Sequence, residues 1–93
     1  MTLEMTKDMM TDKDYKTRFY AEYWQTKIRY DKLHRMLVKW KAETLNFTPT
    51  CPKDLLEVQA RYMEMYLHQL EIRAELEKVD LFGEPKGPAN GNA

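Results

Sequence analysis

The sequence predicts an all-α fold: an antiparallel two-helix hairpin with a short N-terminal helix or arm, assembling into a helical homo-oligomer. Two long stretches of the chain contain no residue that breaks a helix. A segment with two prolines separates these stretches. Within both stretches, apolar side chains recur at alternating spacings of four and three positions, which is typical of packed helices.

The N-terminal part divides into an arm and a first long helix. Residues 1–11 show only a loose apolar pattern and are expected to form an arm or a short helix. Thr11 or Asp12 can cap the next helix, which we expect over about residues 12–45. Its predicted apolar seam consists of Phe19, Tyr23, Thr26, Tyr30, Leu33, Leu37 and Trp40.

Residues 46–52 form the predicted loop, because Pro49 and Pro52 disfavour a helical conformation in the residue before each of them. The second helix is expected over 53–82, ended by Gly83. Together the helices make a hairpin domain over 12–82. The remaining residues, 83–93, are rich in Gly, Pro and Asn and are expected to be a disordered tail.

The second helix carries two neighbouring apolar stripes, whereas one helical partner needs only a narrow one. We therefore expect an obligate homo-oligomer. The alternative is a monomer whose N-terminal arm folds over the hairpin. One stripe is Leu55, Val58, Tyr62, Met65, Gln69, Ile72, Leu76 and Val79, and the other is Leu56, Gln59, Met63, Tyr66 and Leu70.

Composition excludes several classes of protein. The 93 residues suggest one small domain, and no apolar run approaches the length of a membrane span. The chain has no serine, and its three glycines lie at 83 and beyond, which excludes a serine nucleophile and a glycine-rich phosphate loop. The single Cys51 fits a reducing, cytoplasmic compartment. We see no catalytic or metal-binding constellation and expect a non-enzymatic protein without a cofactor.

Charge is distributed unevenly although the net charge is zero. Residues 13–41 hold nine bases and three acids, whereas residues 53–82 hold four bases and seven acids. Pairing between a basic and an acidic helix explains most of this asymmetry. Lys27, however, shares a broad helix face with Tyr20, Tyr23 and Tyr30, and Lys16 and His34 continue the line. Such a lysine either extends from the edge of the core to water or binds an anion next to aromatic side chains that can stack on a nucleotide base.

The second helix also resembles a known family. Leu55, Leu56, Gln59, Met63, Tyr66, Leu70 and Arg73 follow the pattern of small helical-hairpin proteins of tailed bacteriophages. The first helix is similar to theirs in Tyr15-Lys16 and Lys32-Leu33, and the likeness covers about residues 14–80. These hairpins are similar to the anti-CBASS and anti-Thoeris cyclic-oligonucleotide sponges.

The resemblance implies a homohexamer that sequesters, without cleaving, a cyclic di- or trinucleotide or a cyclic ADP-ribose isomer in the cytoplasm of the infected bacterium. It implies base stacking by Tyr15 and phosphate contacts by Lys32 and Arg73. With the residues from the helix face, the expected ligand-binding set is Tyr15, Lys16, Tyr20, Lys27, Lys32 and Arg73. A structural or protein-interaction module without a small ligand is the alternative. Binding to long nucleic acid is not expected, because the acidic helix offsets the basic one.

Overall fold

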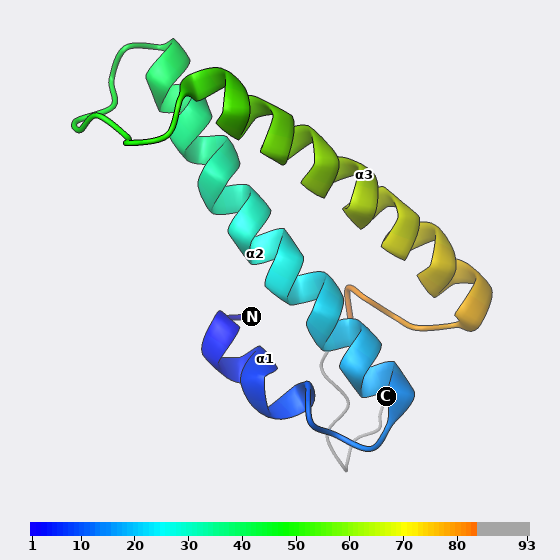
Figure 1. Cartoon of the computed structure of the whole chain (residues 1–93). Helices are drawn as coiled ribbons and strands as arrows, with labels where there is room; N and C mark the ends of the chain where they lie inside the picture. Colours follow the sequence, from blue (N-terminus) through cyan, green and yellow to red (C-terminus); the bar gives the residue numbers. More distant parts are fainter. Residues whose placement is uncertain (84–93) are drawn as a thin grey trace.

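The computed structural model describes residues 1–83, which contain three helices and no strand: α1 (Leu3–Met9), α2 (Tyr15–Lys41) and α3 (Lys53–Glu77). α2 and α3 lie side by side and run in opposite directions, while α1 packs on another side of α2 (Figure 1). The predicted all-α class is therefore confirmed, with the arm folded as a short helix. A single chain does not test the predicted oligomer.

The start of α2 is set by two aspartates. The Asp14 side chain caps the helix by accepting a 3.1 Å hydrogen bond from the Lys16 backbone N–H, and Asp12 in turn accepts a bond from the Asp14 N–H. The cap is thus Asp14 rather than Thr11 or Asp12, and the helix begins at Tyr15. A carboxylate at this position also favours the positive end of the helix dipole.

Both long helices end earlier than predicted, and they end in the same way. Glu43 and Lys78 adopt positive φ angles of 63° and 60°. The next N–H then bonds back across the last turn, from Thr44 to the Lys39 carbonyl and from Val79 to the Ala74 carbonyl. This is the Schellman arrangement, which terminates a helix. The predicted ends at about residues 45 and 82 were wrong for this reason.

The core lies between α2 and α3 and is built largely from the predicted α2 seam: Phe19, Tyr23 and Tyr30 are buried, and Leu33 and Leu37 pack against them. The α3 side of this core differs from both predicted stripes, because it includes three buried residues that belong to neither. The α2-facing seam of α3 consists of Ala60, Met63, Leu67, Leu70 and Ala74.

The segment after α3 turns back onto the hairpin instead of extending the helix. Leu81 is only 3% exposed, and its carbonyl accepts a 2.8 Å hydrogen bond from Trp24 Nε1. Phe82 lies edge-on to the rings of Tyr23 and Trp24. Burying the Leu81 side chain favours the turn at Lys78 over further helix. Most of the tail predicted at 83–93 lies outside the described residues.

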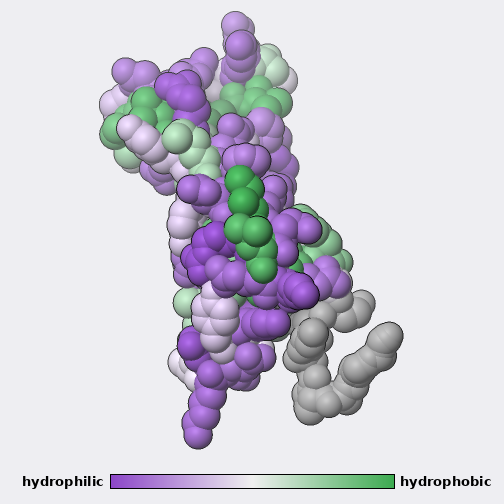
Figure 2. Space-filling model, turned by 90° about the vertical axis from the view of Figure 1, so that its right-hand side faces the viewer, coloured by the Kyte–Doolittle hydropathy of each residue, from purple (hydrophilic) through white to green (hydrophobic). Residues whose placement is uncertain are grey.

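The outer side of α3 exposes several large apolar side chains. Seen from the side on which α3 lies in Figure 1, the face is mostly hydrophilic but carries a compact apolar patch near its centre (Figure 2). Among the exposed large apolar side chains on α3 are Tyr62, Met65 and Leu76. These residues belong to the first of the two stripes predicted from the sequence. The hairpin therefore buries one side of α3 and leaves another in contact with water.

Candidate functional site

Tyr15 and Arg73, two of the six predicted ligand residues, lie together at the start of α2 and near the end of α3. Arg73 Nη2 donates a 2.9 Å hydrogen bond to the Tyr15 hydroxyl, which itself donates to Glu77. Arg73 Nε is also 3.0 Å from Glu77 Oε2, and the guanidinium lies 4.8 Å from the centre of the Phe19 ring. Both side chains thus have partners within the chain, so a ligand phosphate here would compete with a carboxylate.

Lys16 and Tyr20 line a pocket between the end of α1, the start of α2 and the segment after α3. The Tyr20 hydroxyl donates a 3.1 Å hydrogen bond to the Gly83 carbonyl. The acids of this pocket outnumber its bases, since Asp8, Asp12, Asp14 and Asp80 also line it, against Lys16 and Lys78. Such a lining opposes an anionic ligand, because the surrounding carboxylates repel a phosphate.

Lys27 is held on its own helix. Its ammonium lies 3.1 Å from Asp31 Oδ1 and 5.8 Å from the centre of the Tyr30 ring. The aromatic neighbour predicted from the helix face is therefore present. The half-buried position and the ion pair also fit a lysine at the edge of a core.

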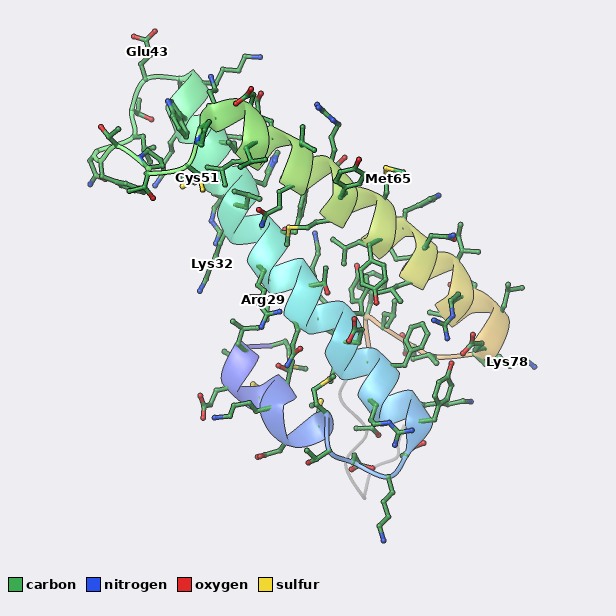
Figure 3. All side chains as sticks on the ribbon, viewed as in Figure 1. Arg29, Lys32, Glu43, Cys51, Met65 and Lys78 are labelled. Carbon is green, nitrogen blue, oxygen red and sulfur yellow. The ribbon has the colours of Figure 1, made fainter. Side chains whose placement is uncertain are left out.

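Lys32 lies in a different setting, on the side of α2 that faces away from α3. Figure 3 shows Lys32 and Arg29 pointing away from the hairpin interface. A shallow groove runs between this side of α2 and the start of the loop. This basic groove is lined by Lys32, Arg35, Met36, Lys39, Thr44, Leu45, Asn46 and Phe47.

The end of α2 shapes the basic groove. The positive φ of Glu43 and the 2.8 Å bond from the Thr44 N–H to the Lys39 carbonyl turn the chain back alongside the helix. Phe47 is thereby placed at the groove with 56% of its surface exposed. Three cations at positions i, i+3 and i+7 share this face of α2. The groove thus combines positive charge with an accessible aromatic ring.

The cations of the groove are not used to join the helices. Among residues 1–83, the ion pairs are Lys27–Asp31 and Arg73–Glu77, each within one helix. Tyrosine hydroxyls link α2 to α3 instead: Tyr15 donates to Glu77, Tyr23 to Glu71, Tyr30 to Glu64, and Tyr66 on α3 to Glu22. The expectation that the basic helix pairs directly with the acidic one is wrong for this part of the chain.

The six predicted residues do not converge in a single chain. Tyr15 and Lys32 are separated by about 25 Å along α2, at 1.5 Å per residue. Their joint role as a ligand site stays a prediction. Sequence reasoning missed Arg35, Lys39 and Phe47. The spacing of residues 32, 35 and 39 was a usable signal for the first two, but Phe47 depends on the path of the loop.

Two further features bear on chemistry. Within residues 1–83, no three His, Cys, Asp or Glu side chains are grouped so as to hold a metal ion. None of the helices in that range is long and apolar enough to cross a membrane.

Comparison with known proteins places the chain in a family. The model of the Sequestin family matches residues 13–76, which include all of α2, α3 except for its last residue, and well over half of the chain. No curated protein and no solved structure matches. The match agrees with the resemblance to phage sponge proteins, and it includes the α2 cations and Arg73. The chain belongs to the Sequestin family, whose name indicates a sequestering function.

Proposed function

We propose that this protein is a phage sponge that sequesters a cyclic nucleotide immune signal in the cytoplasm of the infected bacterium and so blocks anti-phage defence. The ligand class is a cyclic di- or trinucleotide or a cyclic ADP-ribose isomer. The family match over residues 13–76 is the observation that carries the proposal. The ligand is held and not cleaved, so each protein assembly removes a fixed number of signal molecules.

Within the chain, the basic groove suits such a ligand better than the other three locations. A cyclic nucleotide carries phosphates that need cations and bases that stack on rings. Lys32, Arg35 and Lys39 supply the cations, and the exposed Phe47 supplies a ring. No ion pair within the described residues involves these three cations. A phosphate entering the groove therefore displaces water and not a carboxylate.

The proposal includes a homo-oligomer, and the resemblance to the sponges leads us to expect a hexamer. Tyr15, Lys16, Tyr20, Lys27 and Arg73 then contribute to binding only if an assembly brings them near the groove of another copy. Native mass spectrometry of protein purified from bacteria that produce such signals would report the copy number and the mass of the bound ligand together.

The experiment that tests the function is a thermal shift assay against cyclic di- and trinucleotides and cyclic ADP-ribose isomers. We expect a large rise in melting temperature with at least one ligand, since a ligand that binds only the folded state stabilises it. Heat denaturation should then release that ligand intact, as judged by liquid chromatography and mass spectrometry. No shift across the panel, or recovery of a cleaved product, would overturn the proposal.

A second candidate function, a protein-interaction module, is favoured by the apolar face of α3. Leu55, Tyr62, Met65 and Leu76 are all more than half exposed. An affinity pulldown that yields one stoichiometric protein partner, together with no response to any nucleotide in the panel, would support this function over the sponge.

A further inference from the structure

The face of α3 opposite the hairpin interface carries a second, complete heptad pattern. Its positions are spaced by three and four residues, as in the α2-facing seam. Tyr62 is 68% exposed, Met65 63% and Leu76 78%. Figure 3 shows Met65 pointing away from α2. We call this face the outer stripe; its residues are Leu55, Val58, Tyr62, Met65, Gln69, Ile72 and Leu76.

The geometry of the helix keeps the outer stripe away from α2. At about 100° per residue, the stripe is centred roughly 150° around α3 from the α2-facing seam. No movement of α2 can cover both sides at once, and α1 packs on α2 and not on α3. A heptad stripe that extends from Leu55 to Leu76 is the pattern by which one helix packs lengthwise against another.

The charged residues beside the outer stripe are arranged so that a second copy of this chain complements them. Asp54, Arg61, His68 and Glu75 occupy one flank at seven-residue intervals. When two identical helices pair in opposite directions over their full length, residues of this flank face each other. Arg61 of each copy then lies opposite Glu75 of the second copy, so one dimer contains two such pairs. Neither residue has an ion pair within residues 1–83.

Other arrangements of two copies lack this complementarity. Sliding the antiparallel pair by one heptad in one direction sets Asp54 opposite Glu75, which brings like charges together. Sliding it in the other direction moves Glu75 opposite His68 and leaves Arg61 without an acid opposite it. A parallel pair places His68 near Arg73 of the second copy and joins no acid to a base. Like charges that meet across a helix interface disfavour the register in which they meet. The charge pattern therefore selects the full-length antiparallel register.

The apolar positions fit the same register. Tyr62 lies opposite Ile72 of the second copy, and Val58 lies opposite Leu76. The polar Gln69 lies opposite the flexible Met65, whereas parallel pairing would stack two Gln69 side chains. A single polar residue in a heptad stripe disfavours registers that do not accommodate it.

We infer that the outer stripe is the interface between two copies of this chain, packed as an antiparallel α3–α3 pair with Arg61 of each copy opposite Glu75 of the other. Such an interface has twofold symmetry, so it closes on itself and gives assemblies with an even number of copies. The inference concerns assembly alone and does not depend on the proposed ligand.

Analytical ultracentrifugation of the full chain tests the interface. The wild type should sediment as an even multiple of the 11.2 kDa monomer. Met65→Lys should at least halve the particle mass while the helical circular dichroism signal stays unchanged, because Met65 is exposed in the isolated chain. Arg29→Glu, on the side of α2 away from α3, is the control and should keep the wild-type mass.

Charge exchange tests the register. Arg61→Glu and Glu75→Arg should each weaken the pairing by at least about ten-fold, since each replaces two attractions by two repulsions. The double variant should recover affinity to within a few-fold of the wild type. A monomeric wild type, or an assembly indifferent to Met65→Lys, would overturn the interface. Failure of the double variant to recover would overturn the antiparallel register.

Discussion

The hydroxyl of Tyr23 donates a 2.7 Å hydrogen bond to Glu71 Oε2 across the interface between α2 and α3, and the Tyr23 side chain is only 1% exposed. Burial, followed by the Glu71 carboxylate, raises the pKa of this hydroxyl far above its usual value. Two helical turns further along α2, Tyr30 donates a hydrogen bond to Glu64. This bond is the largest cause, and burial the next, of a rise in the pKa of Tyr30 to about 12. The folded chain thus holds protons that the unfolded chain releases near pH 10.

This difference predicts a loss of stability at alkaline pH. A group whose pKa is higher in the folded state stabilises the fold below its unfolded pKa, and this contribution disappears as the pH rises through the folded pKa. The free energy of unfolding should therefore fall between the ordinary tyrosine pKa of 10.0 and the Tyr30 pKa of about 12. Denaturant unfolding followed by circular dichroism at a series of pH values measures this slope.

Tyr30→Phe supplies the variant for that measurement, because it keeps the ring and removes the titrating hydroxyl. The slope should become shallower in Tyr30→Phe. Val38→Ala is the control, since it removes no titrating group and Val38 is 53% exposed, so the slope should stay as in the wild type. An identical slope in wild type and Tyr30→Phe would contradict the prediction.

The helix ends predict a stabilising substitution. Lys78 has a φ of 60°, a conformation that costs a residue with a Cβ roughly 1–2 kcal/mol and glycine much less. Lys78→Gly should therefore raise the free energy of unfolding by about 0.5–1 kcal/mol, after allowing for the greater freedom of glycine in the unfolded chain. Lys32→Gly, at an exposed position inside α2, is the control and should destabilise by about 1 kcal/mol. A lower melting temperature for Lys78→Gly would contradict the assignment of this turn.

These same ends mark where the sequence is a poor guide to the fold. The α2 seam at Phe19, Tyr23 and Tyr30 was predictable because aromatic side chains at heptad spacing point to one partner helix. The helix ends at Glu43 and Lys78 were not predictable, because a left-handed residue at a helix end is usually glycine and neither of these residues is. The groove around Lys32 was half predictable: the cations follow helix periodicity, but the position of Phe47 follows from the turn at Glu43.

The segment after α3 should contribute strongly to stability. Leu81 is 3% exposed and belongs to the core cluster against which Trp24 packs, so removing its side chain leaves a cavity there. Leu81→Ala should cost about 2–5 kcal/mol, the range for buried leucine. Val38→Ala, on an exposed part of α2, should change the free energy of unfolding by less than about 0.5 kcal/mol. Urea titration of both variants distinguishes these values, and equal midpoints would show that this segment does not pack as described.

Binding variants should locate the ligand within the chain. The probe is the nucleotide that gives the largest thermal shift, and isothermal titration calorimetry measures its affinity. Lys32→Ala and Arg35→Ala should each weaken binding about ten-fold, which corresponds to about 1.4 kcal/mol for one lost charged contact. Higher salt should reduce the wild-type affinity, because the groove lies open to solvent.

Two further variants make that measurement decisive. Lys41→Ala is the control, since Lys41 lies on another face of α2 and outside the groove lining, and its affinity should equal that of the wild type. Arg73→Ala reports on the other candidate location, where Arg73 contacts Tyr15 and Glu77. If Arg73→Ala weakens binding at unchanged assembly mass while Lys32→Ala does not, the ligand binds at the Tyr15 end of α2. If Arg73→Ala and Lys32→Ala both weaken nucleotide binding, the assembly joins the two regions in one site.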